Sequence, residues 1–344
     1  MSNYKKKKEE DKSLRLQAKV STLNMEMKRM EQLTELKAIL HSHRANVFYL
    51  EKCRLNVKDG RVVYLTDAKD EKQYWNIPIA NTTVILLGMG TSITQAAVRM
   101  LASAGVLIGF SGSGGTPLIA ATEVEWLSPQ SEYRPTEYLQ GWMSFWFEES
   151  KRLKVAKKFQ HFRLEYIQKV WSKDRELQNA GFYLDDEQTQ QALKTFSEKI
   201  ESCPKVNELM LIEAQFTKRL YKIAATCTNQ KNFVRSRDGD DDANAFLNHG
   251  NYLAYGLAAT TLWVLGIPYG FAVMHGKTRR GALVFDVADL IKDAIVLPQA
   301  FICAKEKMKE QEFRQQVLQM FTKHKALDFM FETIKNMSLE GDKL

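Results

Sequence analysis

The sequence changes character between Pro129 and Pro135, and this change limits the folds that the chain can adopt. Before it, short runs of β-branched and aromatic residues alternate with turn formers such as Lys58-Asp59-Gly60, a pattern typical of strands and hairpins. After it, glycine becomes rarer and long segments with helical periodicity follow. We therefore expect an α+β fold, with a β-rich N-terminal domain over 44–130 and a mostly α-helical C-terminal domain over 131–344.

The composition is that of a folded, mildly basic protein. Of the 344 residues, 44% are hydrophobic and 26% are charged, and the formal net charge is +8. These values exclude global disorder, collagen-like repetition and a disulfide scaffold. The four cysteines lie far apart without a C-x-x-C pair, so a structural zinc site or a thioredoxin-type site lacks its ligand spacing. We expect reduced thiols in a cytoplasmic protein, and no apolar run after the N-terminal lysines predicts a secretory signal.

One segment, Asn251–Gly276, carries no charged residue and is long enough to cross a bilayer. Gly266, Pro268 and Gly270 lie close together near its end. These residues favour a buried helix that stops there and turns the chain.

The N-terminal residues predict a basic helical extension over 1–43. Val20, Leu23, Met27 and Met30 lie on one face of a helix, with lysines nearby. The helix could dock a partner or DNA, or it could pack on its own domain, and the sequence leaves both interpretations open.

Two glycine-rich stretches invite comparison with phosphate-binding loops. After Gly88 and Gly90, Ile93 occupies the third glycine position of a dinucleotide-binding loop. The second stretch, Gly112–Gly115, lacks the Lys-Ser/Thr ending of a P-loop. We interpret both as tight turns.

A basic run, from Lys151 to Lys158, follows the start of the helical half. Such a run can follow a nucleic-acid backbone or can form a solvated helix face. Charge alone does not decide between these two interpretations.

Acidic and imidazole groups in apolar surroundings are the candidates for chemistry. Glu213 lies among Leu209–Ile212 and Phe216 in a predicted helix. A carboxylate in that setting is either paired or coordinates a cation, and the ordinary explanation is an ion pair with Lys218 or Arg219.

A second group of such residues follows the charge-free segment. His275 ends that segment, and Asp286, Asp289 and Asp293 then fall within a roughly 60° arc of one helix face. Three carboxylates on one face repel one another unless a cation or solvent relieves the charge, and Lys292 offers an ordinary partner. One Glu, one His and an Asp pair suit Mg²⁺ or Mn²⁺, an ion that can polarise a phosphodiester and hold an attacking hydroxyl.

The ordered set of motifs resembles the CRISPR adaptation integrase, the Cas one family, and the residues within the motifs resemble those of the type I-F branch. The resemblance extends from about Leu36 to about Phe331. It rests on the segments YWNIPIANTTVILLGMGTSITQAAVRMLASAGVLIGFSGSGGTPL, EYRPTEYLQGW, the Glu-Ala of LIEAQFTKRLYK, the Asn-Tyr of NHGNYLAYGLAA, GIPYGFAVMHG and FDVADLIKD.

The resemblance implies a β-rich N-terminal domain that forms a homodimer and a helical catalytic domain. It implies a divalent ion, Mg²⁺ or Mn²⁺, held by Glu213, His275 and Asp289, with Asp286 at the position of the neighbouring second acid. The implied reaction is the attack of a 3′-hydroxyl of captured DNA on a phosphodiester at a CRISPR repeat.

The resemblance also implies a partner, the small second adaptation protein, which in the I-F branch is fused to the helicase-nuclease of interference. Adjacency to His275 makes Lys277, Arg279 and Arg280 our candidates for binding the DNA backbone. Two alternatives remain open: a metal-dependent nuclease for branched DNA, and a non-catalytic DNA-binding architectural subunit.

Overall fold

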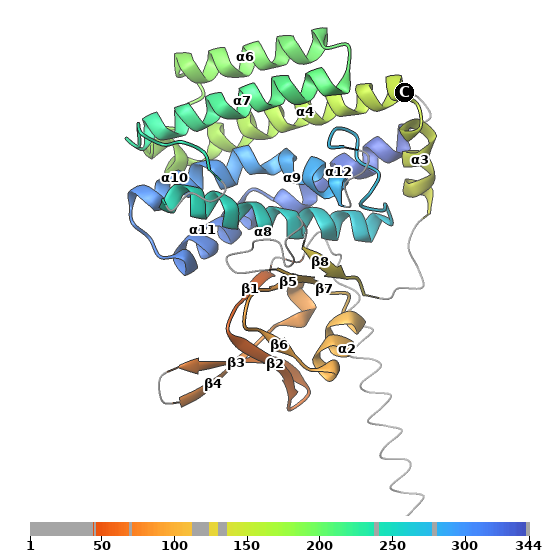
Figure 1. Ribbon diagram of the computed structural model, residues 1–344, viewed down its shortest axis with the longest axis vertical. Coiled ribbons are helices and arrows are strands. Elements are labelled where there is room, and N and C mark those ends of the chain that lie inside the picture. The colour runs from red at the N-terminus through yellow and green to blue at the C-terminus, as the bar shows by residue number, and fades with distance from the viewer. Residues whose placement is uncertain are drawn as a thin grey trace, which may run out of the picture.

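The structure is a computed structural model that describes residues 44, 46–68, 71–111, 124–129, 136–236, 241–276 and 281–341. Within these residues an N-terminal β-rich part precedes a helical part, as Figure 1 shows, so the predicted α+β fold class is confirmed. The predicted N-terminal helix and the Gly112–Gly115 turn lie outside the described residues. The domain limits at 43 and 130 stay predictions.

The β-rich part contains two four-stranded sheets. The first has the order β1 (Asn46–Leu50), β5 (Thr82–Leu87), β7 (Leu107–Phe110) and β8 (Glu125–Leu127), with only β8 antiparallel to its neighbour. The second has the order β4 (Glu71–Asn76), β3 (Arg61–Ala68), β2 (Cys53–Lys58) and β6 (Ser92–Ile93). Asp59 and Gly60 take positive φ values of 50° and 73°, which a tight hairpin between β2 and β3 requires, so the turn predicted there is confirmed.

A helix connects two parallel strands of the first sheet. The hydroxyl of Thr94 accepts from the Ala97 N–H and so caps α2 (Gln95–Ser103), which lies between β5 and β7 in the chain. The glycine turn after β5 therefore opens a β–α–β unit, although the sequence showed no clear repeat of that kind around it. A short 3₁₀ turn, η2 (Ile79–Asn81), precedes β5.

The helical part supplies most of the hydrophobic core. Its elements are α3 (Glu137–Trp146), α4 (Glu149–Lys173), α5 (Arg175–Asn179), α6 (Glu187–Ser202), α7 (Val206–Cys227), α8 (Asp242–Leu265), α9 (Ala282–Ile291), the π-helical segment η4 (Lys292–Val296), α10 (Leu297–Lys305), α11 (Glu310–Lys323) and α12 (Ala326–Leu339).

Helix α8 is the central element of this core. It contacts β5, α9, α10 and α12, and its residues are buried on most sides. The fully buried β5 alternates between two cores: Val84 and Leu86 face the core that contains α8, whereas Ile85 and Leu87 face the core that contains α2. The charge-free segment is thus a core helix, which ends at Gly266 with a φ of 71°. No helix among the described residues is long and apolar enough to span a membrane.

Candidate functional site

Glu213 lies on α7 and is held by a residue from another helix. Arg163 of α4 donates from Nη1 to Glu213 Oε1 at 2.7 Å, and the Thr217 hydroxyl donates to the same oxygen at 2.9 Å. The expected ion pair with Lys218 or Arg219 was therefore wrong. Packing of α4 beside α7 brings a buried guanidinium to Glu213, and neighbours in the sequence do not reveal that partner.

The same guanidinium holds Asp293. Arg163 Nε donates to Asp293 Oδ2 at 2.6 Å, and Nη2 pairs with the same carboxylate. Burial disfavours the charged guanidinium, but the carboxylates of Asp293 and Glu213 outweigh it and raise the pKa of Arg163 above its ordinary value. Arg163 is therefore a permanent positive charge between two acids.

His275 is oriented by Asp286. Its Nδ1 lies 2.6 Å from Asp286 Oδ1, and the carboxylate also accepts from the backbone N–H groups of Val273, Met274 and His275 at 2.7, 3.1 and 3.1 Å. Burial would lower the pKa of His275, but the hydrogen bond with Asp286 and the carboxylate charge raise it above its ordinary value. Both oxygens of Asp286 are thus engaged in fixing the loop and the imidazole ring.

Two tryptophans hold the loop that leads to His275. Trp142 Nε1 donates to the Phe271 carbonyl at 3.0 Å, and Trp146 Nε1 donates to the Ala272 carbonyl at 2.7 Å. Both come from α3, more than a hundred residues earlier in the chain. No local pattern in the sequence links the two segments, so the contact between these tryptophans and the loop was not predicted.

Asp289 is paired with Lys292, the ordinary partner that the sequence offered. The two side chains form an ion pair at the junction of α9 and η4. Burial would raise the pKa of Asp289, but the ammonium of Lys292, followed by His275 and Arg163, outweighs it and lowers the pKa. The carboxylate is therefore charged in the interior.

The structure brings two of the three predicted ligands, Glu213 and Asp289, to one cavity, and the third, His275, lies outside its lining. A cavity of about 50 Å³ is lined by Arg163, Glu213, Thr217, Tyr221, Leu247, Asn251, Asp289, Lys292, Asp293 and Leu297. A positive charge on His275 nevertheless contributes to lowering the pKa of Asp289. Within the described part of the chain, no group of three acidic, imidazole or thiol side chains is close enough to hold an ion as it stands.

Each proposed ligand nevertheless keeps one donor atom open. Glu213 Oε2, Asp289 Oδ2 and His275 Nε2 make no hydrogen bond with any described residue. The other coordinating atom of each side chain is held by Arg163, Lys292 or Asp286, respectively. Two carboxylate oxygens and one imidazole nitrogen match the donor set that Mn²⁺ or Mg²⁺ takes in proteins. The chemistry of the residues therefore fits a divalent ion.

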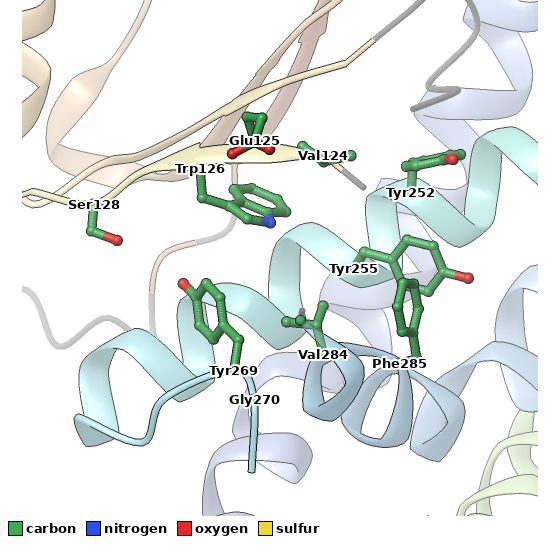
Figure 2. A pocket seen from close by; sticks show the side chains of 11 residues that line it. Val124, Glu125, Trp126, Ser128, Tyr252, Tyr255, Tyr269, Gly270, Val284 and Phe285 are labelled. Carbon is green, nitrogen blue, oxygen red and sulfur yellow. The ribbon is translucent and has the colours of Figure 1, made fainter. Parts of the chain in front are cut away.

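An aromatic pocket lies next to this centre. Figure 2 shows Trp126, on β8, and Tyr269 on opposite sides of a hollow that Tyr255 and Phe285 also line. The pocket has a volume of about 260 Å³. The ring of Phe285 lies 6.1 Å from the ring of His275, and Lys292 Nζ lies 5.3 Å from the ring centre of Tyr255. These aromatics were not predicted from the sequence, where Trp126 lies more than a hundred residues before the other three.

Comparison with known proteins settles the family. The family model for "CRISPR associated protein Cas1" matches residues 47–335. The chain belongs to the Cas1 family. It is 57% identical to the CRISPR-associated endonuclease Cas1 of Pseudomonas aeruginosa (strain UCBPP-PA14), over 89% of this chain and 96% of the relative. It is 54% identical to the protein of the same name from Pectobacterium atrosepticum, over 89% of this chain and 95% of the relative. The resemblance stated from the motifs is confirmed, and these two relatives fit the I-F branch.

Solved structures agree with the Cas1 fold at low sequence identity. A casposase bound to integration product has a TM-score of 0.68 at 12% identity, over 87% of this chain and 91% of the other. A TtCas1–DNA complex has a TM-score of 0.62 at 20% identity, over 85% and 91%. A chain of a Cas6-RT-Cas1–Cas2 complex has a TM-score of 0.61 at 12% identity, over 87% of this chain and 35% of the other.

Two groups of basic residues in this Cas1 chain were candidates for contact with DNA. Lys277, Arg279 and Arg280 lie outside the described residues. Most of the basic run on α4 has partners within the protein: Lys151 pairs with Glu148 at 3.0 Å, the buried Arg152 donates to the Trp146 carbonyl, Lys157 donates to the Glu201 carbonyl, and Lys158 pairs with Glu340. These contacts favour a structural role for the run.

Proposed function

We propose that the protein is a metal-dependent DNA endonuclease and integrase of CRISPR adaptation. It inserts captured DNA fragments into the repeat array by attack of a 3′-hydroxyl on a phosphodiester. Family membership and two relatives above 50% identity, both named CRISPR-associated endonuclease, support the class of enzyme. The structural observation that carries the proposal is that Glu213 and Asp289 line one cavity and that each of them, like His275, keeps one coordinating atom free of hydrogen bonds with the described residues.

Glu213, His275 and Asp289 are the proposed ligands of Mg²⁺ or Mn²⁺. Such an ion, when bound, polarises a phosphodiester and lowers the pKa of an attacking hydroxyl. Asp286 matches the family's second acid, but its two oxygens already accept four hydrogen bonds, so we assign it to holding His275 rather than to the ion. Arg163 and Lys292 hold the neighbouring carboxylates in place, and the ammonium of Lys292 lowers the pKa of Asp289.

The aromatic pocket suits an unpaired nucleotide next to the reacting phosphate. Rings such as Trp126, Tyr255 and Phe285 offer stacking surfaces that accept any base, and such stacking is worth about 1–3 kcal/mol per base. Lys277, Arg279 and Arg280 remain our candidates for contacts with the DNA backbone. The closeness of Phe285 to His275 supports one continuous path for the strand.

We also propose a homodimer through the β-rich part and a second adaptation protein as partner, fused to the helicase-nuclease of interference. A solved neighbour is a chain of a Cas6-RT-Cas1–Cas2 complex, which supports a partner of that kind. The casposase bound to integration product supports strand joining rather than cleavage alone.

The test is an integration assay. The purified protein, its adaptation partner and a duplex with 3′-hydroxyl ends are incubated with a plasmid that bears the repeat, with and without Mn²⁺. Glu213→Ala should abolish joining, because it removes a proposed ligand, while Glu208→Ala, an exposed residue on the same helix, should not. Cleavage without joined strands would favour the nuclease for branched DNA. Full activity of Glu213→Ala would favour the architectural subunit and overturn the proposal.

A further inference from the structure

Arg163 makes an unusually complete set of contacts for a side chain that lacks an assigned role. Its side chain is 2% exposed and carries five N–H donors. Nε donates to Asp293, Nη1 donates to Gln160 at 3.2 Å and to Glu213, and Nη2 donates to Thr217 at 2.8 Å and pairs with Asp293. Five donors therefore meet five acceptor contacts.

We propose that Arg163 is a positioning residue of the metal centre, which ties Glu213 to Asp293 and thereby directs the second oxygen of Glu213 into the cavity. This inference rests on the proposed function, since it concerns the ion that Glu213 would bind. Arg163 does not itself touch the ion or the DNA. It acts through the carboxylate that it holds.

The geometry supports this role because three separate elements meet at one planar group. Arg163 comes from α4, Glu213 from α7 and Asp293 from η4. Arg163 is the only cation paired with Glu213 or Asp293 among the described residues. With Oε1 of Glu213 bound to Arg163 and to the Thr217 hydroxyl, rotation of the carboxylate is blocked and Oε2 keeps one direction. Asp293 fixes the other edge of the guanidinium.

Stability alone does not account for the network. Burying an ion pair costs desolvation that its attraction often fails to repay, and hydrophobic replacements of similar volume are frequently as stable. A buried arginine between two acids at the edge of a polar cavity is better explained by the geometry it imposes. Lysine cannot impose the same geometry, because its three donors lie on one atom and cannot span both carboxylates as a planar fork does.

Electrostatic repulsion would change the affinity for the ion in the opposite direction. A guanidinium beside a cavity repels a divalent ion, so a residue that served only as a resident counter-ion would weaken ion binding, and its removal would tighten it. Removal of a positioning residue instead weakens ion binding. Loss of such a partner, one step removed from the ion, typically lowers metal affinity by about 10–100-fold.

The experiment measures Mn²⁺ affinity of the full chain by isothermal titration calorimetry in the absence of DNA. Arg163→Lys and Arg163→Met should both bind Mn²⁺ about 10–100-fold more weakly than the wild type. The matched control is Arg44→Met, another buried arginine, which donates to the Ala104 carbonyl in the β-rich part. It should lower the melting temperature but leave Mn²⁺ affinity within about twofold, since it has no connection with Glu213.

Each outcome decides the inference. If Arg163→Met does not fold, Arg163→Lys and Asp293→Asn carry the test, because both retain polar side chains of similar size. Unchanged or tighter Mn²⁺ binding by a folded Arg163 variant would overturn the positioning role while leaving the proposed function intact. A wild-type protein that binds no Mn²⁺ would overturn both, so the two failures are distinguishable.

Discussion

Replacing Asp286 by Asn tests whether this residue holds the histidine loop. The substitution keeps the shape of the side chain and exchanges one acceptor oxygen for a donor amide. In the structure, Oδ2 accepts from the N–H groups of Val273 and Met274, and Oδ1 accepts from the N–H of His275 while lying 2.6 Å from its Nδ1. Asparagine can serve only one of these two pairs of donors.

The expected loss of stability follows from that count. With the amide oxygen in the place of Oδ2, the backbone N–H of His275 loses a bond to a charged acceptor, which is worth about 1.5–3 kcal/mol. The two retained bonds become neutral and weaker, which adds roughly 1 kcal/mol. A total of about 3 kcal/mol should lower the melting temperature of the helical part by roughly 6–12 °C, from the about 2–4 °C per kcal/mol typical of a domain of about 150–250 residues.

The same substitution changes the state of the imidazole. A carboxylate that already accepts backbone N–H groups can only accept from Nδ1–H, so the proton stays on Nδ1 and the lone pair of Nε2 stays open. The amide of asparagine instead donates to Nδ1, which moves the proton to Nε2 and blocks it as a ligand. Mn²⁺ affinity should therefore also fall, by about 10–100-fold.

The measurements are thermal unfolding in the presence of a chelator, Mn²⁺ titration, and the ¹⁵N chemical shifts of His275, which report the tautomer. The control is Asp185→Asn, an exposed carboxylate in the helical part, which should change none of the three. A melting temperature within about 2 °C of the wild type in chelator would refute the reasoning, because the roughly 3 kcal/mol assigned to the three backbone bonds would be absent.

Two further predictions concern the fold. Gly141→Ala should destabilise the protein by about 3 kcal/mol in urea unfolding, because a Cβ there would lie 1.9 Å from the backbone carbonyl oxygen of Ser338; a loss below about 1 kcal/mol would contradict the close packing of α3 on α12. Burial would raise the pKa of Asp174, but its bonds with Lys323 at 2.9 Å and His324 at 2.7 Å lower it below its ordinary value. The contribution of Asp174 to the free energy of unfolding is therefore full above about pH 4 and is lost as the pH falls towards its folded-state pKa. Urea unfolding of Asp174→Asn at a series of pH values should lack that part of the acid dependence.

The sequence predicted what local patterns can encode. Strand runs and turn formers indicated the β-rich part, and the absence of charge over Asn251–Gly276 identified the core helix α8 with its end at Gly266. The candidate ligand Glu213 followed from a carboxylate in apolar surroundings. These features depend on neighbouring residues, so they can be read without the tertiary structure.

The partners of those residues could not be read in that way. Arg163 lies 50 residues before Glu213 and 130 before Asp293, and only the packing of three helical elements brings them together. The assumption of a regular α-helix also failed, because Lys292–Val296 is π-helical and Asp293 lies in it. A π segment carries an extra residue per turn, and such segments are frequent at functional sites. The three aspartates of the predicted face pair with three different partners, His275, Lys292 and Arg163, rather than with one shared cation.

The charge balance of the centre shows why those separate pairings still leave room for an ion. Among the described residues the centre contains four carboxylates and two fixed cations, namely Glu213, Asp286, Asp289, Asp293, Arg163 and Lys292. With all four carboxylates ionised and His275 neutral, as a metal ligand must be, the excess would be 4 − 2 = 2 negative charges. Burial raises the pKa of Asp293 above its ordinary value and so reduces this excess. Lys292 compensates Asp289, and three backbone N–H groups relieve Asp286. Glu213 and Asp293 share the single cation Arg163, so the excess lies mainly on that pair, and both acids line the cavity. A cation bound at the cavity offsets this excess, and because uncompensated buried charge is costly, the charge balance of the site favours ion binding.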